Sequence, residues 1–80
     1  MEPESKQLNE SDEAVGLPRR ATSLNARLIV EFDWGQVEVT LDANQAEYAR
    51  KELNKRVGTP VGLFLVTRPN GSPLLKLREV

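Results

Sequence analysis

Apolar and polar residues alternate along two neighbouring segments, residues 27–32 and 36–41. Successive side chains of a β-strand point to opposite faces, so each segment has one apolar face. These faces carry Leu28, Val30 and Phe32 in the first segment and Val37, Val39 and Leu41 in the second. We expect a hairpin with an even-numbered loop, since an odd loop would set an apolar residue against a polar one. With residues 34–35 as a two-residue loop, Val30 faces Val39.

A helix is predicted directly after this hairpin. Asp42 suits the N-cap position, and Gln45 stands three residues later as its capping-box partner. Apolar residues then recur at the spacing of one helix face. They are Ala46, Ala49, Leu53 and Val57. Gly58 suits the left-handed residue after a helix, and Pro60 prevents the helix from continuing.

Residues 61–66 are uncharged and apolar at positions that point to both sides of a strand. Val61, Leu63 and Leu65 share one face, and Phe64 and Val66 share the other. Such a strand needs cover on both faces, and one helix covers only one of them.

A turn at residues 68–71 and a last strand over residues 74–79 follow. The predicted order is β-β-α-β-β. The sequence therefore predicts a small single domain of the α+β class. Its four-stranded antiparallel or mixed sheet has one helix packed on one face.

The N-terminal segment has a different composition. Residues 1–18 contain five acids and one base, a net charge of −4, whereas residues 19–80 contain ten bases and seven acids, a net of +3. Its few apolar residues are too scattered to form a face, so burial offsets little of the ordering entropy. We expect a disordered acidic tail over residues 1–25 and a folded domain over residues 26–80.

The residue types present exclude several kinds of chemistry. The chain has no cysteine and no histidine, so disulfides, thiolate zinc sites and the commonest general base are absent. No phosphate-binding glycine loop or serine nucleophile motif occurs. We predict a non-enzymatic protein with no cofactor and no metal. No apolar run is long enough to span a bilayer, so we also expect a cytoplasmic protein with no membrane partner.

The uncovered side of residues 61–67 suggests what the protein does. An apolar strand face, or an open sheet edge, can dock a second copy or another protein. We therefore predict an interaction, adaptor or regulatory domain, with interface residues Phe64, Val66, Trp34 and Leu74. Two structural alternatives stay open: tail residues such as Leu17 or Leu24 cover the strand, and Trp34 folds back to cap the core.

A second possible class of function, nucleic-acid binding, has weaker support in the sequence. Four cations of the predicted helix could meet nucleic-acid phosphates. They are Arg50, Lys51, Lys55 and Arg56. Glu47 and Glu52 lie among them at the spacing of ion pairs, which favours an ordinary solvated helix face.

Overall fold

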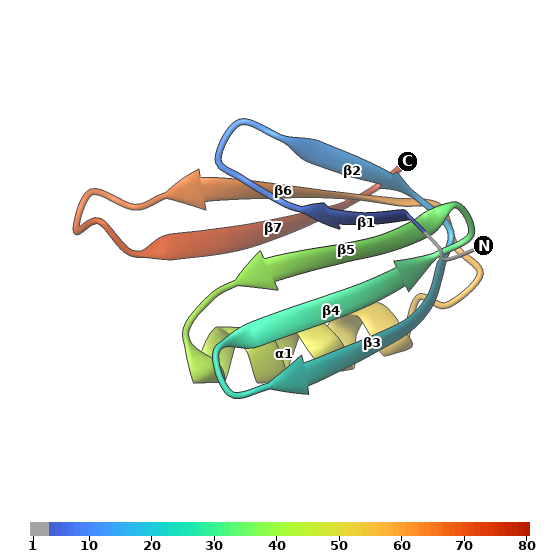
Figure 1. The fold of residues 1–80 in the computed structure, drawn as a ribbon, viewed down its shortest axis with the longest axis horizontal. Helices are drawn as coiled ribbons and strands as arrows, with labels where there is room; N and C mark the ends of the chain where they lie inside the picture. The colour runs from blue at the N-terminus through green and yellow to red at the C-terminus, as the bar shows by residue number, and fades with distance from the viewer. Residues whose placement is uncertain (1–3) are drawn as a thin grey trace.

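The computed structural model describes residues 4–80, with side chains from residue 6 onward, as two β-sheets and one helix (Figure 1). One sheet has the strand order β1-β5-β4-β3, and the other has the order β2-β6-β7. The strands are β1 (Glu4–Gln7), β2 (Glu13–Gly16), β3 (Pro18–Leu24), β4 (Arg27–Phe32), β5 (Gly35–Thr40), β6 (Val61–Thr67) and β7 (Pro73–Glu79), and the helix is α1 (Ala43–Asn54).

The predicted first hairpin is β4 and β5, but its loop lies one residue earlier than expected. Phe32 pairs with Gly35, so the two-residue loop is residues 33–34 and Val30 faces Val37 rather than Val39. The even loop is confirmed, and both strands keep their apolar face inward. A shift of two residues preserves that face, so alternation alone does not distinguish the two registers.

Helix α1 begins where predicted. Asp42 is its N-cap, and the Asp42 Oδ1 atom accepts a hydrogen bond of 2.8 Å from the Gln45 backbone N–H. Its buried residues are Ala46, Ala49 and Leu53. Val57 was expected on the same stripe, but it lies beyond the helix and is 51% exposed. Within residues 4–80, no helix has the length and apolarity needed to cross a membrane.

The core lies between the sheet β1-β5-β4-β3 on one side and the second layer, formed by β2-β6-β7 and α1, on the other (Figure 1). Val61 and Leu63 of β6 are fully buried there, and Leu65 packs at the margin. The α+β class and the single helix are confirmed. The prediction of one four-stranded sheet is wrong, because β6 and β7 pair in a separate sheet that faces the first hairpin.

The N-terminal segment is where the structure departs most from the sequence prediction. Residues 1–3 lie outside the described residues, but residues 4–24 contain β1, β2 and β3 rather than a disordered tail. Strand β1 pairs in parallel with β5, and β2 pairs antiparallel with β6. Leu8 and Ala14 from this segment join the core. Ordering is favourable here because the partner strands supply the backbone hydrogen bonds and the apolar cover that the segment lacks by itself.

Candidate functional site

The sheet β2-β6-β7 has one face on the core and one face toward solvent, which we call the outer face. Residues directly opposite one another in a sheet share a face. On the outer face, one row contains Glu13, Phe64 and Lys76, and the next contains Val66 and Leu74. Phe64, Val66 and Leu74 are half-buried. Three of the four predicted interface residues are therefore neighbours on one surface, and no described strand covers that surface.

The outer face of the other sheet is polar by contrast. It carries an ion pair between Arg20 and Glu31, with 2.9 Å between the atoms, and a second between Arg27 and Glu38. Ile29 is the half-buried apolar residue at the centre of this face. The apolar surface at β6 and β7 is thus a property of one sheet rather than of both.

An ion pair crosses the outer face beside Phe64. Glu13 of β2 accepts hydrogen bonds of 2.8 Å and 3.0 Å from the Nε and Nη2 atoms of Arg78 of β7. The pair passes over Gly62 of the central strand, where an added Cβ would lie 3.1 Å from a Glu13 carboxylate oxygen. Glycine therefore gives the two side chains room to meet. The hydrogen bonds from Arg78 hold the pKa of Glu13 below its ordinary value.

A hollow of about 540 Å³ opens on the β2 side of this face. Its apolar side includes Phe64, Leu65 and Val66. The residues that lead into β2 form the other side, and they are Glu10, Ser11, Asp12 and Glu13. Thr67 and Arg78 complete the lining, and Arg78 is paired with Glu13. The hollow is thus apolar beneath, and its rim on the β2 side is acidic. Sequence reasoning missed its acidic residues because no local pattern places the N-terminal segment beside β6.

Trp34 does not join the other three predicted interface residues. It lies in the β4–β5 loop, at the opposite end of the molecule from the β6–β7 turn (Figure 1). Its ring stacks on Phe32 with centroids 5.4 Å apart, and its Nε1–H donates a hydrogen bond of 2.8 Å to the Val15 carbonyl. Trp34 is 37% exposed. Its geometry is that of the second alternative considered for Trp34, in which the indole folds back over the protein.

Side chains also satisfy the backbone at the margins of both sheets. Asn54, the last residue of α1, accepts a hydrogen bond of 3.0 Å from the Ala21 N–H of β3 and donates one of 3.1 Å to the Ala21 carbonyl. Gln45 donates one of 2.8 Å to the Pro73 carbonyl of β7. Together with Trp34 on β2, these contacts occupy backbone groups that would otherwise be open to another strand. A side-chain amide can donate and accept at the same time, as Asn54 does here. The sequence does not show which Asn or Gln residue makes such contacts.

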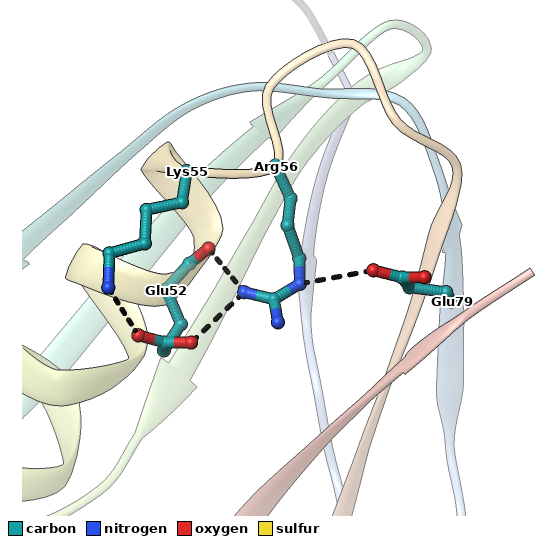
Figure 2. A network of polar contacts seen from close by, with 4 residues as sticks. All are labelled: Glu52, Lys55, Arg56 and Glu79. Carbon is teal, nitrogen blue, oxygen red and sulfur yellow. Dashed lines mark hydrogen bonds and ion pairs between the residues drawn. The ribbon is translucent and has the colours of Figure 1, made fainter.

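The four predicted nucleic-acid-binding cations are held by helix carboxylates. Arg50 and Lys51 lie 2.7 Å and 3.9 Å from Glu47. Lys55 and Arg56 each lie 3.1 Å from Glu52, and Arg56 also approaches Glu79 at 3.7 Å (Figure 2). Hydrogen bonds from these cations hold the pKa of Glu47 and of Glu52 below the ordinary value. The cluster is therefore close to electrically balanced, which leaves little net charge for a phosphate backbone.

Among residues 4–80, no group of three or more carboxylate side chains is arranged to hold a metal ion. No family model matches this chain, and no curated protein or solved structure is significantly similar to it. The outer face of β2-β6-β7, with its adjoining hollow, is thus the candidate functional site.

Proposed function

We propose that this protein is a non-enzymatic interaction domain that docks a protein partner through the outer face of β2-β6-β7. The observation that carries the proposal is the grouping of Phe64, Val66 and Leu74 on one solvent-facing surface. Neighbouring apolar residues on a surface mark interaction sites when polar residues surround them. Here Glu13, Lys76 and Arg78 supply the polar rim.

A sheet edge is a less favourable docking route than this face. The β7 edge lies beside α1, with Gln45 bonded to Pro73 at one end and Arg56 near Glu79 at the other. At the β2 edge, the Trp34 Nε1–H donates a hydrogen bond to the Val15 carbonyl. An added strand would have to displace these contacts before it gained its own hydrogen bonds.

Two matched variants test the proposal. Phe64→Ser and Ile29→Ser each remove a half-buried apolar side chain from the solvent side of a central strand, one on each sheet. Proteins that the wild-type chain captures from an extract of its own cells are purified and recombined with it, and backbone NMR shifts locate the contact. We expect Phe64→Ser to weaken binding at least tenfold, Ile29→Ser to leave it unchanged, and the shifts to centre on Phe64, Val66 and Leu74.

Two results contradict the proposal. One is a purified partner that binds Phe64→Ser as tightly as wild type or shifts residues elsewhere. The other is a chain that binds neither a captured protein nor itself.

A further inference from the structure

The two flanks of the outer face carry opposite charge. The β2 flank carries the acidic rim of the hollow, and the β7 flank carries Lys76 and Arg78. Arg78 is paired with Glu13, but within residues 6–80 Glu10, Asp12 and Lys76 have no ion-pair partner. One surface therefore presents unpaired acids on one side of β6 and an unpaired base on the other.

The flanks also differ in shape. Beside β6 on the β2 side is the hollow of about 540 Å³ with Phe64 and Val66 along it. On the β7 side, Leu74 stands opposite Val66 and Lys76 stands opposite Phe64. An apolar side chain that enters the hollow would contact Phe64 and Val66, and a neighbouring cation would reach the acidic rim. Leu74 and Lys76 have this chemistry, and they are two residues apart on one strand face.

We infer that the partner seated on the outer face is a second copy of this chain, related by a two-fold axis parallel to β6. The inference rests on the proposed function, because it uses the same face. Such an axis exchanges the two flanks, so that β7 of each copy lies over β2 of the other. It brings Leu74 and Lys76 of each copy to the hollow of the other, and Phe64 meets its own equivalent near the axis.

Charge selects this orientation over the alternative. A two-fold axis perpendicular to the strands that passes beside the hollow sets β2 over β2, which places Glu10 and Asp12 against the same acids of the second copy. The axis parallel to β6 instead sets each acidic rim against Lys76 of the other copy, and symmetry makes every contact twice. Like charges brought together without compensation are costly at an interface. A face of three short strands is small, so we expect a weak dimer below about 1,200 Å² of total buried surface.

Charge exchange between two variants gives a sharp test. Lys76→Glu places acid against acid in its own homodimer, and Glu10→Lys/Asp12→Lys places base against base. An equimolar mixture of the two restores both sets of opposite charges in the heterodimer. By analytical ultracentrifugation we expect wild type to dimerise, each variant alone to dimerise at least tenfold more weakly, and the mixture to recover close to wild-type affinity.

Two controls keep the test specific. Lys51→Glu makes the same charge change on α1, away from the outer face, and is expected to dimerise as wild type does. Because the Asp12 carboxylate accepts a hydrogen bond of 3.2 Å from the Asn9 N–H, Glu10→Lys alone serves as a second acidic-rim variant if the double variant does not fold.

The outcomes separate this inference from the proposed function. The inference of a second copy is overturned if the wild-type chain stays monomeric at millimolar concentration. It is also overturned if the mixture of the two charge variants fails to recover the dimer. In either case the proposed docking face is still supported if Phe64→Ser weakens the binding of a purified captured protein. A dimer that neither Phe64→Ser nor Lys76→Glu weakens forms through another surface and also overturns the inference.

Discussion

At the scale of single residues, Gly16 and Trp34 form one close contact. A Cβ added at Gly16 would lie 2.6 Å from Trp34 Nε1, which is the atom that donates to the Val15 carbonyl. Real Cβ atoms do not approach so closely, so the indole of Gly16→Ala must move. The glycine therefore allows the only tryptophan of the chain to lie against β2.

We predict that Gly16→Ala costs about 1–3 kcal/mol of unfolding free energy, as overpacking does, and shifts the Trp34 fluorescence to longer wavelength. Urea titration followed by circular dichroism measures the first effect, and emission spectra measure the second. In a Trp34→Ala background the same substitution should cost less, because the clashing ring is gone and Asp33 Oδ1, 3.0 Å from the added Cβ, is the close neighbour that remains. An equal cost in both backgrounds would locate the strain elsewhere.

Asn54 is a second residue whose role depends on one contact. Its amide bonds both backbone groups of Ala21, which is buried. We predict that Asn54→Ala lowers the free energy of unfolding by about 1–2 kcal/mol, because two backbone groups lose their partner. Asn44→Ala is the matched control on the same helix, where the exposed side chain makes no such bond, and it should change stability by less than about 0.5 kcal/mol. Equal denaturation midpoints for the two variants would contradict this role.

At the scale of elements, the sequence predicted the helix and the strands whose signals come from neighbouring residues in the chain. Helix α1, with Asp42 as N-cap, and the strands β4 to β7 were placed within a residue or two, since alternation, capping and turn residues are all local signals. Strands β1, β2 and β3 were all missed, since residues 1–25 were expected to be a disordered tail. Strand β3 pairs with the adjacent β4 and was missed because its mostly polar composition hid the hairpin. Strands β1 and β2 were missed because their partners are distant in the chain. Glu4 pairs with Gly35, and Glu13 pairs with Phe64. The same limit hid the acidic rim of the hollow, whereas the two-sided apolar pattern of β6 placed Phe64 and Val66 on its second face, and alternation in β7 placed Leu74 on the same face as Lys76.

Helix α1 carries three carboxylates that are stabilised in their charged form. Hydrogen bonds from Gln45 lower the pKa of Asp42, and hydrogen bonds from basic side chains lower those of Glu47 and Glu52. A carboxylate whose pKa is lower in the folded state contributes stability above its unfolded pKa, and that contribution is lost as pH falls through the folded pKa. These carboxylates are therefore expected to make the protein less stable in acid, where they become protonated, and not in base.

We predict that the urea midpoint falls between pH 7 and pH 3 and that Asp42→Asn shows a smaller fall. Asparagine is also a good N-cap, so this variant keeps the cap and removes one titrating group. Circular dichroism at the two pH values measures both midpoints. If wild type and Asp42→Asn lost the same stability in acid, the Asp42 carboxylate would have no part in the effect.

At the scale of the whole molecule, the N-terminal segment unites the two sheets. Strand β1 extends the first sheet, β2 extends the second, and Leu8 between them is 1% exposed within the shared core. The segment also forms the acidic rim of the hollow. The proposed docking face is thus assembled from both ends of the chain, and its geometry depends on the packing of a segment whose composition alone predicts a disordered tail.

This dependence is tested by two leucine substitutions in the same segment. Leu8→Ala removes a fully buried side chain and should cost about 2–5 kcal/mol of unfolding free energy. Leu17→Ala makes the same change at a side chain that is 38% exposed and should cost less than about 1 kcal/mol, since little apolar surface is lost from the core. Urea denaturation measures both. A packed segment requires this difference, because Leu8 contacts the core only when β1 and β2 are in place, whereas a disordered tail would make both substitutions silent.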